Sequence, residues 1–384
     1  MSNTLVTIDM VTREALRIAH EKCQFISTTD RQYDSSFAKT GAKIGASLRV
    51  RKPNQYLRTQ GTRVMDVQEQ DEQTSTVTVA TQDHVDMRFN SAELALSLDE
   101  LSKRYIEPAV SSLVSAIEGD YLAYATKKTY NVVGTAGTAI TDLTAPGLAR
   151  ARLNQMLAPK DRNRAIQMDS VTMAGLVKGV AAYFNPSGAI SEQYREGLVA
   201  RTSMADYYEN ERVWTLTNSA DVTVTTAAAA AVTDGGTNIT LASVAAGDTT
   251  AGMTFTVAGV YACHPETKQS LGYLQPYVVI TGGATTQTVS PATILTGPRQ
   301  NVCSAASAQL ATTAYNGTAV AVTFFGAANT SYAQSLMYHK EAFQFVTADL
   351  PLMDDAHKCV RRSQDGLSLR VWQASDIRND ELLM

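Results

Sequence analysis

The most constraining feature of this 384-residue chain is a long stretch, Ser219 to Ala328, that is almost without charge. From Asp221 to Thr330 it carries six charged residues and is rich in Thr, Ala, Val and Gly. Short β-prone runs such as TFTVAGVYA and YLQPYVVI alternate with the turn signals DGG, AGD and TGG. Because charged, partly helical sequence lies on both sides, the stretch predicts a self-contained β-module inserted into an α+β host.

The overall charge and hydropathy exclude several classes of protein. A formal net charge of −4 and a pI near 5.8 argue against a general polyanion binder. No run of about 18 uncharged apolar residues exists, so we expect no membrane span. Asp9, Arg13 and Glu14 stand where a secretory signal would have its apolar core. We therefore expect the protein to stay in the cytoplasm in which it is made.

The cysteines do not form a metal-binding or redox motif. They are scattered at Cys23, Cys263, Cys303 and Cys359, without a CxxC pair. We expect four buried or free thiols. A Cys263–Cys303 disulfide within the β-module is the alternative, and a reducing compartment disfavours it.

The segment from Gly41 to Met65 has six basic residues and no acidic one, whereas Asp66 to Glu72 has four acidic residues and no basic one. Alternating strand patterns flank this segment, in ASLRVRKP before it and STVTVATQ after it. The pattern predicts a two-stranded hairpin with about 15 residues per arm, reaching about 50 Å. Such a ribbon has little core of its own, so it needs a surface to lie on, most plausibly another copy of the chain. A solvated surface hairpin is the alternative.

Helical spacing is clearest from Pro108 to Lys128, with an apolar stripe that includes Val110, Val114 and Tyr124. An amphipathic helix is also expected within Thr7–Ser27, and further helices around residues 147–159 and 171–184. We expect a strand at RAIQMDS, a loop with a short helix over 191–210, a last strand at LSLRVWQAS, and a polar tail after it.

Catalytic constellations are absent from the sequence. None of the five histidines lies in an HExxH motif or beside a GxSxG elbow, and no phosphate-binding glycine motif follows a strand. Asp83 and Asp86 flank His84 at a predicted strand-to-helix transition, where a surface turn is favoured over a metal site. Tyr207, Tyr208 and Trp214 are expected to pack rather than to stack bases. We therefore expect no enzyme, catalytic residue, cofactor or metal.

The order of these elements resembles the major capsid proteins of tailed double-stranded DNA bacteriophages, which have the Hong Kong 97-type fold. It is most similar to the coat-protein branch of short-tailed temperate phages, whose members carry an inserted six-stranded β-barrel. The likeness rests on SLDELSKRYIEPAVSSLVSAIEGDYL, NITLASVAAGDTTAGMTFTVAGVYACHP, MYHKEAFQFVTADLPL and LSLRVWQASDIRNDE, in that order. This chain departs from the best-known members in looking shorter over Ala228–Val244 and near its C-terminus.

The resemblance implies an α+β capsid fold with an extended hairpin loop, a peripheral domain with a long spine helix, an axial domain and an inserted small β-barrel. The implied parts are an N-terminal arm (1–45), the hairpin loop (46–82), the peripheral domain (83–130), the axial domain (131–218 and 329–352), the inserted barrel (219–328) and a closing strand with C-terminal tail (353–384).

The resemblance also implies a function in assembly: pentamers and hexamers of this chain close an icosahedral virion capsid in the host cytoplasm. A scaffolding protein and a portal protein are implied partners, and the shell encloses double-stranded DNA without sequence-specific binding. The alternatives are the shell of a non-viral nanocompartment and a β-rich phage tail or surface component. Ion pairs between subunits are expected from the hairpin and the spine-helix region, at Arg49, Arg51, Lys52, Arg58, Arg63, Asp66, Glu69, Asp99, Glu100 and Glu107.

Overall fold

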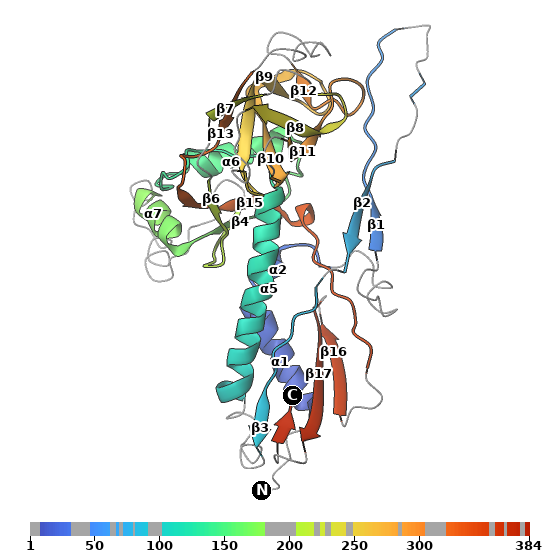
Figure 1. The fold of residues 1–384 in the computed structure, drawn as a ribbon, viewed down its shortest axis with the longest axis vertical. Helices are drawn as coiled ribbons and strands as arrows, with labels where there is room; N and C mark the ends of the chain where they lie inside the picture. Colours follow the sequence, from blue (N-terminus) through green and yellow to red (C-terminus); the bar gives the residue numbers. More distant parts are fainter. Residues whose placement is uncertain are drawn as a thin grey trace. The chain divides into compact units, whose positions relative to one another are not determined.

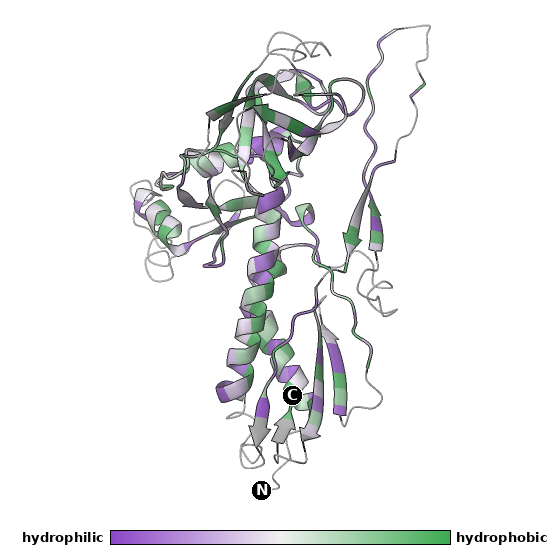
Figure 2. Cartoon of the chain, viewed as in Figure 1, coloured by the Kyte–Doolittle hydropathy of each residue, from purple (hydrophilic) through white to green (hydrophobic). Residues whose placement is uncertain are grey.

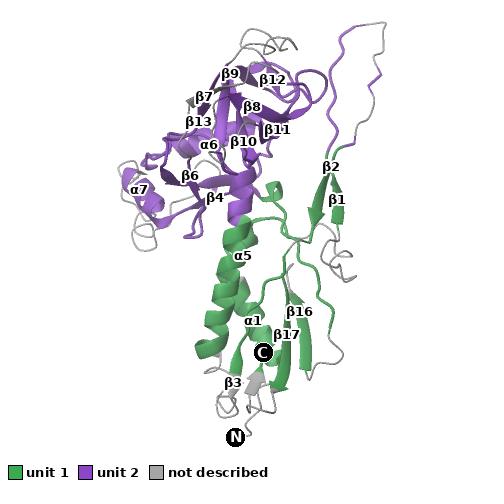
Figure 3. Ribbon diagram, in the orientation of Figure 1, with its two compact units in different colours: residues 1–52, 73–121, 340–384 green, residues 53–72, 122–339 purple. Residues whose placement is uncertain are grey.

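The computed structural model describes residues 8–31, 47–61, 67–68, 72–79, 81–90, 102–180, 205–218, 223–226, 232–242, 249–282, 286–303, 320–352, 358–364, 367–376 and 381–384. Within these ranges the chain is mixed α+β, with one long helix, several shorter helices and several separate sheets (Figure 1). It divides into two compact units, each described below by itself (Figure 3). Unit 1 comprises Met1–Lys52, Gln73–Tyr121 and Lys340–Met384, and unit 2 comprises Pro53–Glu72 and Leu122–His339.

The helices of unit 1 are α1 (Ile8–Lys22), α2 (Phe25–Thr28) and most of α5 (Glu107–Lys128), which a π-helical turn (Ser102–Ile106) precedes. The helix expected within Thr7–Ser27 is thus present in two pieces. Asp9 in the first turn of α1 and Lys127 and Lys128 in the last turn of α5 carry charges that suit the helix dipoles.

The buried face of α5 differs from the predicted stripe. Val110 and Val114 are buried as expected, but Tyr124 is 60% exposed. The fully buried positions further along are Glu118, Leu122 and Ala125, which follow Val114 at the four-, four- and three-residue spacing of one helix face. A carboxylate therefore lies on the face that the sequence pattern assigned to apolar side chains.

Unit 1 also contains a four-stranded antiparallel sheet in the order β16-β17-β18-β3. Its strands are β16 (Lys358–Gln364), β17 (Leu367–Asp376), β18 (Glu381–Leu383) and β3 (Arg88–Asn90). Apolar side chains of α1 and α5 form one core with Leu367 and Leu369 of β17. Two expectations are corrected: the tail after β17 contains a strand, and the segment after Asp86 continues as a strand rather than as a helix.

In unit 2, the strands β15 (Leu336–His339), β4 (Arg164–Met168) and β5 (Asp206–Glu209) form a three-stranded sheet. β4 is buried along its whole length, because it lies between antiparallel β15 and parallel β5. The helices α6 (Thr144–Gln155) and α7 (Ser170–Val180) flank β4 in the chain. The expected loop over 191–210 is corrected at its end, which forms β5.

The low-charge stretch forms the largest sheet of unit 2. Its order is β10-β11-β8-β7-β13-β9-β12, and β10 also pairs with β9, so six strands close into a ring to which β12 is added. The strands are β7 (Thr223–Thr226), β8 (Gly236–Ala242), β9 (Thr254–Cys263), β10 (Ser270–Thr281), β11 (Thr286–Thr293), β12 (Val302–Cys303) and β13 (Ala321–Phe324). Phe255 packs against Tyr277 and Phe324 inside the ring, with ring centroids 5.9 and 5.2 Å apart.

The chain enters and leaves this module through two paired strands. β6 (Thr215–Thr217) lies antiparallel to β14 (Ser331–Ala333), with Leu216 opposite Tyr332. At the module end of the pair, the Asn218 side chain donates to the backbone oxygen of Phe325 at 2.8 Å. Entry and exit are therefore held together by backbone pairing and by one buried amide.

Candidate assembly surface

The predicted hairpin begins with a short regular ladder. β1 (Ser47–Arg51) pairs antiparallel with β2 (Thr74–Thr78) over five residue pairs, and Lys52 N donates to Gln73 O at 2.8 Å beyond them. Among the described residues, strand pairing covers only this base, so the arms are less regular than the predicted hairpin with about 15 residues per arm.

Farther along the hairpin sequence, the side chain of Gln68 bonds to the backbone of Leu57 as a neighbouring strand would. Leu57 N donates to Gln68 Oε1 at 2.8 Å, and Gln68 Nε2 donates to Leu57 O at 2.6 Å. An amide side chain can imitate the donor and acceptor of a neighbouring backbone in this way. The two contacts hold the arms together at a point where neither is a regular strand.

The hairpin ladder has two different faces. Leu48 and Val50 are half-buried, whereas Arg49 and Arg51 alternate with them and are exposed, opposite threonines of β2. None of the residues 47–61 or 72–79 is buried, and the arm beyond β1 is largely hydrophilic (Figure 2). The ladder therefore presents a cationic, hydroxyl-bearing face and a narrow apolar face, with no enclosed core between them.

The structure places some of the predicted contact residues. Arg49, Arg51, Lys52 and Arg58 are all exposed. Glu107 is the first residue of α5, with its Oε1 3.7 Å from Lys22 Nζ of the same chain. The remaining predicted contacts, Arg63, Asp66, Glu69, Asp99 and Glu100, lie outside the described residues.

Glu118 has a structural role that the sequence pattern did not indicate. Its side chain is fully buried on α5, and its Oε1 accepts the backbone N–H of Gln24 at 2.9 Å and that of Phe25. These donors begin α2, where helical N–H groups have no partner within the helix. The available signal in the sequence was its position four residues after Val114 of the apolar stripe, because a Glu on a buried helix face needs hydrogen-bond partners.

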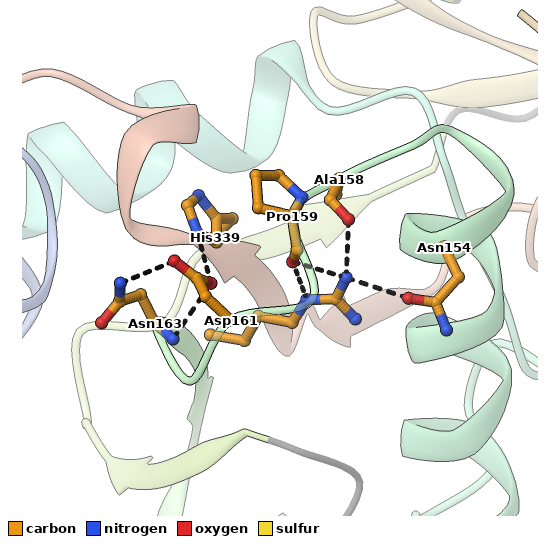
Figure 4. Close-up of polar contacts among 7 residues, drawn as sticks. Asn154, Ala158, Pro159, Asp161, Asn163 and His339 are labelled. Carbon is orange, nitrogen blue, oxygen red and sulfur yellow. Dashed lines mark hydrogen bonds and ion pairs between the residues drawn. The ribbon is translucent and has the colours of Figure 1, made fainter.

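A second polar group, also missed, lies between α6 and β4 (Figure 4). Arg164 is 1% exposed, and its guanidinium donates to Asn154 Oδ1 at 2.9 Å, Ala158 O at 2.9 Å and Pro159 O at 2.8 Å. Burial lowers the pKa of Arg164, with a further contribution from the charge of Arg150. These hydrogen bonds stabilise the turn of the chain between α6 and β4.

Beside this reversal, the buried His339 at the end of β15 meets the exposed Asp161. The His339 Nε2 atom is 2.8 Å from Asp161 Oδ1, and Asp161 also accepts from the backbone and side chain of Asn163 (Figure 4). Desolvation opposes ionisation of Asp161, but the hydrogen bonds from His339 and Asn163 outweigh it and lower the pKa of this carboxyl. Every one of these contacts holds the loop before β4 in place.

An analogous carboxylate lies in unit 1. Asp9 on α1 accepts from Arg362 on β16 at 2.8 and 2.6 Å, and Arg13 one turn along α1 lies 2.9 Å from it. Hydrogen bonding from Arg362 lowers the pKa of Asp9. Desolvation opposes this effect, and the charges of Arg13 and Arg362 add to the lowering. This pair joins α1 to the sheet.

The expected packing role of two aromatic residues is confirmed. Tyr207 packs against the buried cluster around β4, and Trp214 packs against the core of the inserted module. Lys127 Nζ lies 5.3 Å from the Trp214 ring centroid, within the range of a cation–π contact.

Neither a metal site nor a membrane helix is found in the described parts of the chain. They contain no group of three or more His, Cys, Asp or Glu side chains that could hold a metal ion. His84 and Asp86 meet at 3.1 Å, but both side chains are strongly exposed, at 69% and 83%. No helix within the described ranges is long and apolar enough to cross a membrane.

Comparisons with known proteins find little. No family model matches the chain, and no curated protein matches it. A solved structure from Mycobacterium phage Che8 is similar to part of it, with a TM-score of 0.38 and 12% identity, covering 49% of this chain and 69% of that one. The function proposed below therefore rests on the residues of this chain.

Proposed function

We propose that this chain is the major capsid protein of a tailed phage, with the Hong Kong 97-type fold, and that it self-assembles into an icosahedral head. The observation that carries the proposal is the hairpin, in which none of the residues 47–61 or 72–79 is buried. A two-stranded ribbon without a core is marginal in water, so it gains stability by lying on another surface. A second copy of the chain supplies such a surface in a closed symmetric shell.

The order of the elements along the chain supports the same proposal. A helical arm (α1 and α2) is followed by the hairpin, the long helix α5, a small sheet with β4 at its centre, the inserted module and the closing strands β16 and β17. This is the order that the capsid resemblance implies. In that arrangement α5 is the spine helix and the ring of β-strands is the inserted domain.

The cationic face of the hairpin would contact carboxylates of a neighbouring copy. Each exposed ion pair contributes only about 0–1 kcal/mol, so one such contact cannot hold a shell together. Repetition in every subunit makes the contacts additive across the lattice and fixes which surfaces meet. Arg49 and Arg51 carry this role on the ladder, the exposed Lys52 and Arg58 carry it beyond the ladder, and the carboxylates around Glu107 are the candidate partners.

Assembly into a phage head also implies further binding partners for the chain. A scaffolding protein would direct the curvature of the shell, and a portal protein would occupy one vertex. Double-stranded DNA would be enclosed without sequence-specific contacts, which agrees with a net charge of −4. The protein would have no catalytic turnover.

Electron microscopy of the expressed full-length chain, with and without a co-expressed scaffolding protein, tests the proposal. Closed particles, or a regular lattice of rings or tubes, are the expected result. A chain that remains a monomer at high concentration, even with scaffold, would overturn the proposal and favour a tail or surface component. Enclosed protein cargo in place of DNA would instead favour a nanocompartment shell.

The role of the hairpin is tested by charge reversal. Arg49→Glu, combined with Arg51→Glu, should leave the free subunit folded and reduce the yield of particles by tenfold or more. The matched control is Lys358→Glu, which reverses an exposed charge on β16. If the two variants assemble equally well, the cationic face has no role in assembly. The test of whether the chain forms a shell at all is unaffected by that result.

A further inference from the structure

The inserted module contains two cysteines that the proposed function does not use. Cys263 ends β9 and Cys303 ends β12, and their exposed fractions are 2% and 0%. β12 pairs antiparallel with β9, with Val302 opposite Ala262 and Cys303 opposite Tyr261. Because alternate residues of a strand point to the same face, this register puts Cys263 and Cys303 on one face, diagonally across the pair.

The two thiol groups are neighbours in this arrangement. Cys303 Sγ lies 3.7 Å from the backbone oxygen of Ala262, the residue before Cys263, and Cys263 Sγ lies 3.8 Å from the backbone oxygen of His264. A disulfide needs its sulfur atoms about 2 Å apart, so the side chains of a diagonal pair must move towards one another to form it. The remaining movement falls on side-chain torsions and on β12, a short strand that pairs with β9 through two residue pairs.

We propose that Cys263 and Cys303 form an oxidisable dithiol, which a small peroxide converts into an intramolecular disulfide within the module. The proposal is independent of the capsid function. It concerns a covalent modification of the chain itself, and it can be tested on the free subunit.

Access to the pair is through Cys263. This residue lines a cavity of about 230 Å³ together with Pro265, Gln300 and Asn301. One water-sized molecule needs about 10–15 Å³ of such space, so a small peroxide fits. Cys263 lines this cavity and Cys303 is not among its lining residues, so in the proposed order of reaction Cys263 is oxidised first.

The surroundings of Cys263 make the reaction slow. Burial, with contributions from Cys303, raises the pKa of the Cys263 thiol to about 12, and the charge of Lys268 opposes this rise. Lys268 is itself buried and donates from Nζ to Pro298 O at 2.6 Å. Since the thiolate is the nucleophile, oxidation should accelerate with pH and remain slow near neutrality.

The reaction balances with hydrogen peroxide as the oxidant. The Cys263 thiolate attacks one peroxide oxygen and breaks the O–O bond, which gives a sulfenic acid and a hydroxide that takes up the thiol proton. The Cys303 sulfur then attacks Cys263 Sγ, the S–O bond breaks, and the hydroxyl group leaves as water with the Cys303 proton. Two thiols lose two electrons, one peroxide is reduced, and two waters form.

Intact-mass and peptide mapping of the full chain test the proposal directly. After removal of reductant and treatment with hydrogen peroxide at pH 8, the mass should fall by about 2 Da, for the two hydrogens lost. Tryptic peptides that contain Cys263 and Cys303 should be linked, and reductant should separate them. The proposal is overturned if both cysteines remain alkylatable, become separate sulfinic acids, or link to Cys23 or Cys359 instead.

Two variants test the order of the steps. Cys303→Ser should stop the reaction at the Cys263 sulfenic acid, which dimedone labels, so the readout does not require a disulfide. Cys359→Ser is the control and should keep the linkage unchanged. Absence of dimedone label at Cys263 in Cys303→Ser, with label present at other cysteines, would refute attack through the cavity.

The linkage would also change stability. It closes a loop that contains β10 and β11, and cross-links over loops of this length restrict the unfolded chain. The oxidised module should therefore unfold at a temperature about 5 °C or more above that of the reduced module. An unchanged or lower unfolding temperature of a fully linked sample would contradict this consequence.

Discussion

Glu118 provides the sharpest test of how unit 1 is held together. Its buried carboxylate accepts two backbone N–H groups, from Gln24 and Phe25, at the start of α2. Hydrogen bonds to a charged acceptor contribute about 1.5–3 kcal/mol each, and two bonds to one oxygen contribute less than twice that value. Glu118→Ala also leaves the Phe25 N–H buried without this acceptor. We expect a loss of about 3–5 kcal/mol.

The variant Glu118→Gln separates the contribution of the side chain's charge to stability from that of its shape. It keeps the volume of the side chain and one carbonyl acceptor, so the expected loss is about 1–2 kcal/mol. Urea unfolding of the free subunit measures both losses, and hydrogen exchange at the amides of Gln24 and Phe25 reports the local effect. Asp120→Ala, at an exposed position of the same helix, is the control and should change stability by less than about 0.5 kcal/mol.

The reasoning about Glu118 would be refuted by a specific result. If Glu118→Ala unfolds within about 0.5 kcal/mol of the parent chain, and the Phe25 amide keeps its protection, the carboxylate does not hold α2. A large loss in Glu118→Ala together with unchanged exchange at Gln24 and Phe25 would place its contribution elsewhere in the core.

Three further predictions concern a buried arginine, a glycine with a positive φ and a surface carboxylate. Arg164→Met should cost about 2–4 kcal/mol in urea unfolding, because three acceptors lose their donor, whereas a Met substitution of the exposed Lys160 should be neutral. Gly252→Ala should cost about 1–3 kcal/mol, because Gly252 has φ +96° and an added Cβ would collide with the Trp214 ring; an unchanged melting temperature would contradict this. The lowered pKa of Asp9 means that its contribution is complete above its unfolded pKa, about 4, and is lost as pH falls through the lower folded value. Asp9→Asn should therefore reduce the decline of melting temperature below about pH 4, and a parallel decline would count against the Arg362 contact.

The long helix shows how far sequence periodicity reaches. The spacing from Pro108 to Lys128 predicts the helix almost to its ends, because caps, charges and periodicity agree there. The same spacing assigned Tyr124 to the apolar stripe and overlooked Glu118. Periodicity reports an average face, whereas the residues that are buried depend on what packs on the helix. Side chains of α1 and α2, for example, cover Val110 and Val114, a tertiary effect that the local pattern does not contain.

Short strands were the main omissions. β5 and β18 have four and three residues, too few for an alternation pattern to be distinguished from a polar loop. Each exists because a longer strand lies beside it, β4 for the first and β17 for the second. The hairpin gave the opposite error: alternation on both sides of the turn predicted long arms, but within the described residues the ladder covers five residue pairs. Farther along the chain, the Gln68 side chain bonds to the backbone of Leu57.

The paired strands at the base of the inserted module make the module replaceable. Because β6 and β14 are neighbours, with Thr217 opposite Ser331, a short turn can join them with the intervening residues deleted. The same site can accept a foreign polypeptide whose two ends lie close together, without stretching the rest of unit 2. The β6–β14 pair is thus a natural grafting point, at which each copy of this chain would carry one displayed peptide or enzyme.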